Sequence, residues 1–218
     1  MKSGLPSRAA VNRMISYLRL MEELLEDGVE WVSSSEIATA LGITSSSVRQ
    51  DLTWLDFSGV PKSGYNTHEL HNALRSFLKA DCQYNVILIG AGNLGRALAS
   101  HEGFRRDGYH IEAIFDTKPE LIGQSIGDVP IYHFKDLDDL VHKHGWRLAI
   151  IAVPPAAAQA VGESLVRAGI CGILNLSAKH LHLPSHVTVV DVRLIGALRE
   201  LTFSLHRKGC RCQIQKMN

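Results

Sequence analysis

The chain has 218 residues, enough for one large domain or two small ones. Its hydrophobic fraction of 45% excludes a disordered chain, and no apolar run approaches the roughly 20 residues that a membrane-spanning helix needs. The net charge is only +1, so charge alone does not indicate a nucleic-acid partner. The N-terminal sequence lacks the apolar core of a secretory signal, which favours a cytoplasmic protein that does not associate with a membrane.

The charge is distributed unevenly along the chain. Residues 1–80 carry a net charge of −1, residues 81–192 carry −3 and residues 193–218 carry +5. The first 21 residues are nevertheless basic, because Lys2, Arg8, Arg13 and Arg19 precede any acidic residue. Phosphate contacts, if present, therefore depend on local groups and not on the overall charge of a domain.

The N-terminal third begins with a predicted amphipathic helix over about Arg8 to Glu26. Its apolar face is expected to consist of Val11, Met14, Ile15, Leu18, Met21 or Glu22, and Leu25. Gly28 follows and ends the helix.

Two shorter helices follow, joined by a glycine. Ser33 or Ser34 is suited to cap the first of them, and Glu36 is placed to complete a capping box with Ser33. Gly42 forms the tight turn and Thr44 caps the next helix. That helix turns Val48, Leu52 and Leu55 inward.

A helix, a glycine turn and a second helix form the helix-turn-helix arrangement of DNA-binding proteins. The outward face of the second helix carries Ser45, Ser46, Ser47, Arg49, Gln50 and Thr53. Hydroxyl groups and an arginine near a helix N-terminus suit phosphates and base edges. A small helical dimerisation module is the alternative interpretation of the same pattern.

The segment after Leu55 is rich in turn residues, with Gly59, Pro61 and Gly64. It has the length of a wing, a short hairpin beside the recognition helix, with Lys62 at its tip and Tyr65 just after it. A helix over Thr67 to Leu78 then leads into the second domain.

The middle of the chain contains a glycine-rich turn between a strand and a helix. The apolar strand from Asn85 runs directly into the sequence Gly90-Ala91-Gly92-Asn93-Leu94-Gly95, which opens a helix. This is the G-x-G-x-x-G pattern of dinucleotide-binding domains in its required context. The three glycines permit the tight turn, the approach of a pyrophosphate, and close packing of helix on strand.

The next predicted strand, His110 to Asp116, ends in a carboxylate 26 residues after Gly90. A carboxylate there can accept both ribose hydroxyls of an adenosine and would repel a 2′-phosphate, which favours NAD(H) over NADP(H). Strands and helices continue to alternate to the end of the domain, which predicts a doubly wound parallel sheet. The ends of the later strands place Val153, Pro154, Asn175 and Ser177 near the dinucleotide, with Asp191 further along.

Features of an enzyme are not found in the sequence. A dehydrogenase usually has a substrate domain of about 100 residues, and the helix-turn-helix module already occupies that length here. There is no Tyr-x-x-x-Lys pair, so no catalytic residue is assigned.

No metal site is assigned either. The histidines His180, His182 and His186 are interpreted as loop residues because no neighbouring acidic residue or cysteine completes a ligand set. Cys82, Cys171, Cys210 and Cys212 lack C-x-x-C spacing and are expected to be reduced.

The C-terminal segment contains Leu194, Leu198, Leu201 and Leu205 at helical spacing, a narrow apolar seam that favours dimerisation through this helix. Packing of the helix onto its own sheet is the alternative. The last residues are basic and polar, as in a flexible tail.

Taken together, these segments resemble the Rex family of redox-sensing transcriptional repressors over about residues 5–207. The resemblance rests on an ordered series of motifs that includes SSSEIATALGITSSSVRQDL, ILIGAGNLGRALA, IFDTKPELIG, AGICGILNL and VTVVDV. It implies an α/β chain with an N-terminal winged helix-turn-helix domain, a C-terminal Rossmann doubly wound parallel sheet and a C-terminal dimerisation helix. It also implies a homodimer that binds palindromic operator DNA when NADH is scarce and leaves the DNA when NADH binds.

The expected domains are residues 1–80 for DNA binding, 81–192 for NAD(H) binding, 193–209 for the dimerisation helix and 210–218 for a flexible tail. NADH and NAD⁺ are the expected effector ligands, with cofactor-binding residues Gly90, Ala91, Gly92, Asn93, Leu94, Gly95, Asp116, Thr117, Lys118, Val153, Pro154, Asn175, Ser177 and His101. The expected DNA-binding residues are Ser45, Ser46, Ser47, Arg49, Gln50, Lys62 and Tyr65. The resemblance further pairs Arg13 with Asp191 as an interdomain switch.

The sequence departs from the family pattern at a few positions, which leaves other interpretations open. Gln50 replaces a lysine of the recognition helix, Ser63 stands where the wing carries a basic run, and His101 replaces a tyrosine. A divergent paralogue without specific DNA binding and a nucleotide-dependent enzyme are therefore alternatives. A sensor of coenzyme A is a third, against which Asp116 favours NAD.

Overall fold

The structure is a computed structural model that describes residues 4–207. Its contacts divide the chain into two compact units, and the boundary along the chain lies between Gln83 and Tyr84. Each unit has a core of its own, so the two are described separately. The expected tail, residues 210–218, lies outside the described residues together with Cys210 and Cys212.

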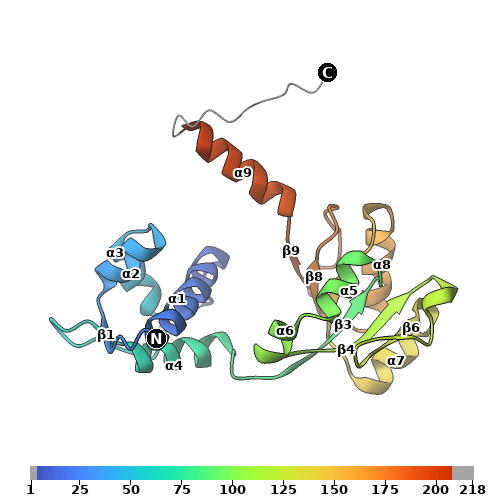
Figure 1. Cartoon of the computed structure of the whole chain (residues 1–218), viewed down its shortest axis with the longest axis horizontal. Coiled ribbons are helices and arrows are strands. Elements are labelled where there is room, and N and C mark those ends of the chain that lie inside the picture. Colours follow the sequence, from blue (N-terminus) through green and yellow to red (C-terminus); the bar gives the residue numbers. More distant parts are fainter. Residues whose placement is uncertain (1–3, 208–218) are drawn as a thin grey trace. The chain divides into compact units, whose positions relative to one another are not determined.

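The first unit consists of four helices and a two-stranded ribbon (Figure 1). In chain order these are α1 (Arg8–Glu26), β1 (Trp31–Val32), α2 (Ser34–Leu41), α3 (Ser45–Leu52), β2 (Tyr65–Asn66) and α4 (Thr67–Leu78). The helix-turn-helix is formed by α2 and α3, and its inward residues Val48, Leu52 and Leu55 are buried as expected.

The buried face of α1 differs from the predicted one. Met14 and Met21 are buried as expected, but Tyr17 is fully buried as well, and Ile15 is 53% exposed. The prediction placed an apolar isoleucine inside and did not consider the tyrosine. Tyr17 is accommodated in the core because its hydroxyl donates a hydrogen bond to the Asp51 carboxylate, at 2.7 Å.

The ends of α2 and α3 are fixed by their caps. The Ser33 hydroxyl accepts from the backbone amide of Glu36, and the Glu36 carboxylate accepts from the amide of Ser33, which completes the predicted capping box. These bonds hold the pKa of Glu36 below its ordinary value. Gly42 ends α2 in the left-handed region with φ of +64°, and the Thr44 hydroxyl caps α3.

Replacing Ser33 with alanine is expected to destabilise the first unit by about 1 kcal/mol, the usual loss for an N-cap. Glu36 is exposed and Ser33 is half-buried, and neither belongs to the buried core cluster of this unit. Urea unfolding followed by circular dichroism measures the difference, with Ser58→Ala, an exposed serine of the turn region, as the control. Equal midpoints for the two variants would contradict a contribution of the cap to stability.

The wing is present and short. The strands β1 and β2 pair antiparallel, and a single further bridge joins Val60 to Gly64. Between them the chain turns through Lys62, whose φ of +72° is rare for a residue with a side chain. This turn places the exposed Lys62 at the tip of the wing, as predicted.

The second unit is built on a seven-stranded sheet with the strand order β5-β6-β4-β3-β7-β8-β9. All neighbours are parallel except β5, which pairs antiparallel with β6 at one edge. The strands are β3 (Tyr84–Ile89), β4 (Tyr109–Asp116), β5 (Ser125–Ile126), β6 (Val129–His133), β7 (Leu148–Ile151), β8 (Gly172–Asn175) and β9 (Thr188–Asp191). The six parallel strands follow the Rossmann order, which reverses between β3 and β7.

The two faces of this sheet are covered by different helices (Figure 1). One face packs against α7 (Leu137–His144) and α8 (Pro155–Arg167), and the other packs against α5 (Asn93–Ala99) and α6 (Glu102–Arg106). The helix α6 and the edge strand β5 were not predicted, because each is too short for a periodic pattern to emerge. The helix predicted from Lys135 begins instead with a 3₁₀ turn and becomes α-helical at Leu137.

The last described element is α9 (Leu194–Arg207). Within residues 4–207 no residue of α9 is buried. Its large apolar side chains are between 54% and 70% exposed at Leu194, Ile195, Leu198, Leu201 and Phe203. The seam predicted for this helix is therefore not covered by the described part of the same chain.

Candidate nucleotide site and DNA-binding surface

A cavity of about 530 Å³ lies at the carboxyl ends of β4, β3 and β7, where the strand order reverses. Open α/β sheets bind their ligands at this position. Seven of the predicted cofactor residues line it, namely Gly90, Gly92, Asp116, Thr117, Lys118, Val153 and Pro154. The topology of the sheet thus brings together residues from three separate turns.

Each of the three glycines in the turn after β3 has a different structural environment. Gly90 has a φ of +105°, and a Cβ atom there would lie 2.6 Å from the carbonyl oxygen of Ala152. At Gly95 a Cβ atom would collide with the carbonyl oxygen of Gly90. At Gly92 nothing lies within 4 Å of the position of a Cβ atom, so the backbone there is open to an approaching group. The close contacts at Gly90 and Gly95 fit the predicted tight turn and close packing of helix on strand, and the approach of a pyrophosphate at Gly92 stays a prediction.

Asp116 is half-buried at the end of β4 and receives three backbone amides. Its Oδ2 atom accepts from Ala91 at 2.7 Å, and its Oδ1 atom accepts from Thr117 at 2.8 Å and from Lys118 at 3.0 Å. A carboxylate offers about four acceptor positions, so one remains for a ligand hydroxyl while these bonds are kept. Asp116 therefore also ties the glycine turn to the end of the neighbouring strand.

One wall of the cavity was missed by the sequence analysis. Ala157, Ala160, Val161 and Ser164 of α8 line it, together with Phe134. The four α8 positions have the spacing i, i+3, i+4 and i+7, so they lie on one face of that helix. This spacing, in a helix that begins at a predicted ligand-binding strand end, was the signal available in the sequence.

Asn175 and Ser177 do not line this cavity, because they are buried and bonded to one another. The Asn175 side-chain oxygen accepts from the Ser177 amide at 3.1 Å and from its hydroxyl at 2.6 Å. The Asn175 amide nitrogen donates to Asp191 and to the carbonyl oxygen of Lys179. These bonds use the polar atoms of Asn175 to fix the loop after β8 to the end of β9.

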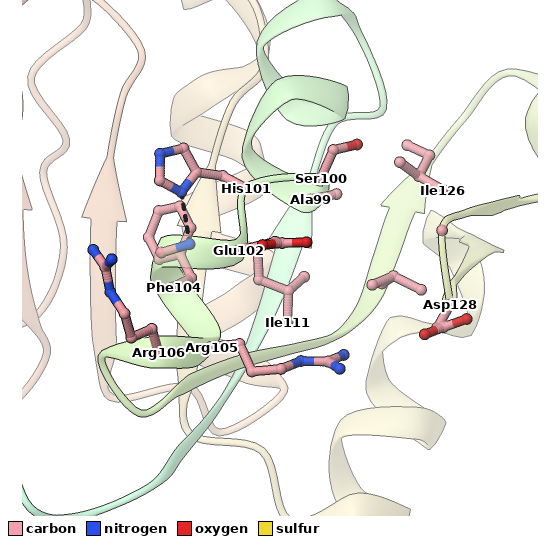
Figure 2. A pocket seen from close by; sticks show the side chains of 13 residues that line it. Ala99, Ser100, His101, Glu102, Phe104, Arg105, Arg106, Ile111, Ile126 and Asp128 are labelled. Atoms are coloured by element: carbon pink, nitrogen blue, oxygen red, sulfur yellow. Dashed lines mark hydrogen bonds between the residues drawn. The ribbon is translucent and has the colours of Figure 1, made fainter.

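His101 lies in a different place from the nucleotide cavity. It caps α6, where its Nδ1 atom accepts from the Gly103 amide at 3.0 Å, and its ring meets Phe104 edge-on. Figure 2 shows both rings on one side of a second hollow, of about 980 Å³, with Ile126 and Asp128 across from them. The turn between α5 and α6 carries His101 to this hollow.

The other predicted residues of the glycine turn are Ala91, which precedes α5, and three residues of its first turn. Asn93 and Leu94 are exposed, Ala91 is buried, and Gly95 packs against the turn. None of these four lines the cavity. The Ala91 amide is donated to Asp116, so only the amides at the start of the helix remain for a ligand among these residues.

The outward surface of the first unit holds the predicted DNA-binding residues. Ser46, Arg49, Gln50 and Lys62 are exposed, while Ser45 and Ser47 are half-buried at the start of α3. The Arg49 guanidinium donates to the Ser34 hydroxyl at 3.2 Å, which links α3 to the N-terminus of α2.

Tyr65 is placed differently from the exposed residues of this surface. It is half-buried, and its ring lies against Phe57, with centroids 6.0 Å apart. The Tyr65 ring thus supports the wing from the core side.

Arg13 and Asp191 each have partners within their own unit. Arg13 makes two bonds of 2.7 Å to Asp51, whereas Asp191 accepts from Asn175, His180 and Arg193. Burial opposes ionisation of Asp191, but the bonds from His180 and Asn175 outweigh it and hold its pKa below the ordinary value. The pairing of Arg13 with Asp191 stays a prediction.

The described residues contain neither a metal-ligand cluster nor a membrane-spanning helix. Within residues 4–207, no three His, Cys, Asp or Glu side chains gather as a metal site would require. In the same residues, no helix has both the length and the apolar character needed to cross a membrane.

The fold and the site thus define a chain in which a winged helix-turn-helix unit precedes a dinucleotide-type Rossmann unit. Comparison with known proteins agrees with both parts. Residues 6–53 match a family described as a putative DNA-binding protein N-terminus, and residues 81–179 match a CoA binding domain family.

Relatives that match more than nine tenths of the chain support the same two-part assignment. The chain is 38% identical to the redox-sensing transcriptional repressor Rex of Thermosipho africanus over 92% of this chain and 96% of that protein. It is 37% identical to the protein of the same name from Clostridium botulinum, over 93% and 96%. This chain belongs to the Rex family of redox-sensing transcriptional repressors.

Two solved structures of a Rex-family repressor named RSP extend the comparison to the fold. The complex of RSP with NADH matches 95% of this chain and 97% of that one, with a TM-score of 0.87 and 36% identity. The complex with NAD⁺ and operator DNA matches 95% of each chain, with a TM-score of 0.88 and 35% identity. The winged-helix and Rossmann prediction is confirmed by these matches.

Proposed function

We propose that this chain is a transcriptional repressor that binds palindromic operator DNA as a homodimer and leaves it when NADH binds. The observation that carries the proposal is the placement of seven predicted cofactor residues around one cavity in a chain that also retains an intact recognition helix. Relatives of matching length are named redox-sensing repressors, and RSP has been solved with NADH and with operator DNA.

NADH and NAD⁺ are the proposed effectors in this cavity. We place the pyrophosphate at the backbone amides where α5 begins, and the remaining acceptor position of Asp116 takes a ribose hydroxyl. Its negative charge disfavours a ligand with a 2′-phosphate. The matched family is named for coenzyme A, so calorimetric titration should compare NADH, NAD⁺, NADPH and coenzyme A. Tightest binding of coenzyme A would overturn the proposed ligand.

Operator DNA is proposed to contact the exposed hydroxyls of α3, Arg49, Gln50 and the wing lysine Lys62. The corresponding domains are residues 1–80 for DNA and 81–192 for the nucleotide, with residues 193–209 as the dimerisation helix. Since its target is the chromosome, we place the protein in the cytoplasm.

We also propose that the chain is not an enzyme. The polar side chains that line the cavity are Asp116, Thr117, Lys118 and Ser164, and three backbone amides already occupy Asp116. No histidine, the most common proton-transfer residue of enzymes, is among the lining residues. Oxidation of NADH by the purified protein in the presence of a small carbonyl substrate would contradict this part.

A dimer is proposed because α9 leaves so much apolar surface uncovered. Leu194, Leu198 and Leu201 form one seam, and Phe203 lies on the opposite side of the helix. A helix that is apolar on more than one side is normally enclosed by other elements. A second copy of the chain supplies the enclosure, and two copies place two recognition helices on the two half-sites of a palindrome.

The double variant Leu198→Lys/Leu201→Lys is expected to be monomeric, because two charges would enter the apolar seam. Light scattering after size exclusion measures its mass. Operator affinity should fall with dimerisation, since each monomer then holds one half-site alone. Glu200→Lys, on the same helix outside the seam, is the control. A dimeric double variant would contradict the role of α9.

Selection of binding sites from a random duplex library tests the proposal as a whole. Enriched sequences should contain two inverted half-sites with centres one helical turn of DNA apart or a multiple of that distance. Addition of NADH during selection should abolish the enrichment. Failure to enrich any sequence at low salt, where phosphate contacts are strongest, would favour the divergent paralogue.

A further inference from the structure

A carboxylate is buried in the core of the helix-turn-helix unit. Among residues 4–207, Asp51 is the only charged residue that is fully buried, with 3% of its surface exposed. It lies on the inward side of α3, directly after Arg49 and Gln50. A buried carboxylate is unfavourable unless it is paired and hydrogen-bonded, so its partners determine what it contributes.

Two side chains of α1 satisfy this carboxylate. The Arg13 guanidinium donates to both oxygens, with Nε to Oδ2 and Nη2 to Oδ1 each at 2.7 Å. The Tyr17 hydroxyl donates to Oδ2 at 2.7 Å. The bond to Asp51 raises the pKa of Arg13, and burial together with the same carboxylate raises the pKa of Tyr17. Both groups therefore remain donors at physiological pH.

This cluster of Arg13, Tyr17 and Asp51 constrains α3 in a way that its apolar contacts do not. Val48 and Leu52 fix the distance of α3 from the core, but apolar contacts are non-directional. A two-point arginine–carboxylate pair has a defined geometry and resists rotation of the helix about its axis. The helix has only eight residues, so its position depends on tertiary anchors.

We propose that Asp51 is a positioning residue for DNA recognition, which sets the rotation of α3 so that Arg49 and Gln50 meet the base edges in one register. Asp51 itself faces the core and does not contact DNA. The inference rests on the proposed function. It assigns sequence specificity to the buried cluster, while phosphate contacts supply affinity that is independent of sequence.

The test compares the affinity for selected operator with that for a scrambled duplex of equal length and composition, at one salt concentration. Asp51→Asn keeps the side-chain volume and loses the charge, and Tyr17→Phe keeps the buried ring and loses one donor. Asp56→Asn is the matched control, because it removes the same charge from an exposed residue just after α3. Thermal unfolding establishes that each variant is folded at the assay temperature.

The expected result is a loss of at least tenfold in operator affinity for Asp51→Asn, with scrambled-duplex affinity unchanged within about threefold. Tyr17→Phe should lose less, and Asp56→Asn should keep the ratio of the two affinities. If Asp51 served folding alone, both affinities would fall together with the folded fraction. An unchanged ratio in a folded Asp51→Asn variant would overturn the inference.

Arg13→Lys separates geometry from charge, since lysine neutralises Asp51 without the two-point contact. If Arg13→Lys keeps the wild-type ratio of operator affinity to scrambled-duplex affinity, the geometric account is wrong.

Amide hydrogen exchange, measured without DNA, distinguishes failure of this inference from failure of the proposed function. If the wild-type chain selects no operator, the proposed function falls, and faster exchange confined to α3 in Asp51→Asn still supports the anchoring. Unchanged exchange in α3 overturns it.

Discussion

Replacing Arg49 with alanine is expected to abolish specific operator binding and leave NADH affinity unchanged. Arg49 is exposed on the outward face of α3, and its bond to Ser34 leaves other donors for a guanine edge or a phosphate. A two-point arginine–base contact contributes about 1–3 kcal/mol, and a dimer would lose it twice. The operator dissociation constant should therefore rise by a factor of roughly 30 or more.

Fluorescence anisotropy with labelled operator measures this change, and calorimetry with NADH measures the second unit independently. Arg19→Ala is the matched control, because Arg19 carries the same charge on α1 with its side chain 83% exposed. Arg19→Ala should reduce operator affinity only modestly. Operator affinity that survives in Arg49→Ala would place the DNA-binding surface outside α3.

Replacing Asp116 with alanine should produce the opposite pattern, with weak NADH binding and normal operator binding. A hydrogen bond to a charged group contributes about 1.5–3 kcal/mol, so loss of the ribose contact should weaken NADH binding by at least tenfold. The variant should stay on the operator at NADH concentrations that release the wild-type protein. If NADH releases it at an unchanged concentration, Asp116 is not the ribose acceptor.

The structure adds a complication to that experiment and a way to resolve it. Asp116 also holds the amide of Ala91, so alanine loosens the glycine turn as well as removing a ligand contact. Asp116→Asn keeps an acceptor for the turn and removes the charge. Asp107→Ala, an exposed acidic residue of the same unit, controls for net charge. Melting without ligand reports the loss of the turn, and the gain in melting temperature with NADH reports binding.

Local patterns predicted the fold well because their causes are local. The capping box of Ser33 and Glu36, the left-handed turn at Gly42 and the strand–glycine–helix order at Gly90 all depend on residues a few positions apart. Each pattern constrains backbone conformation directly, whatever the rest of the chain does. The bounds predicted for α1 and α4 agree with the structure for the same reason.

Features that depend on distant residues were not predictable in this way. The burial of Tyr17 follows from Asp51, which is 34 residues away along the chain. The α8 wall of the cavity has a helical spacing that the sequence shows, but only the packing of α8 on the sheet turns this face toward the strand ends. Asn175 and Ser177 come from the end of a parallel strand, as expected, yet their polar atoms bond to each other and to the neighbouring loop. Strand order places such residues only approximately, and side-chain partners decide their exposure.

The central claim, that NADH controls DNA binding, is tested most directly by a gel shift. Promoter fragments that carry the selected operator would be titrated with protein, and then with NADH and NAD⁺ separately at a fixed total salt concentration. We expect a specific complex that NADH dissolves at far lower concentration than NAD⁺ does. A specific complex that persists at saturating concentrations of both nucleotides would contradict the account, because the chain would then be a repressor that does not sense NADH.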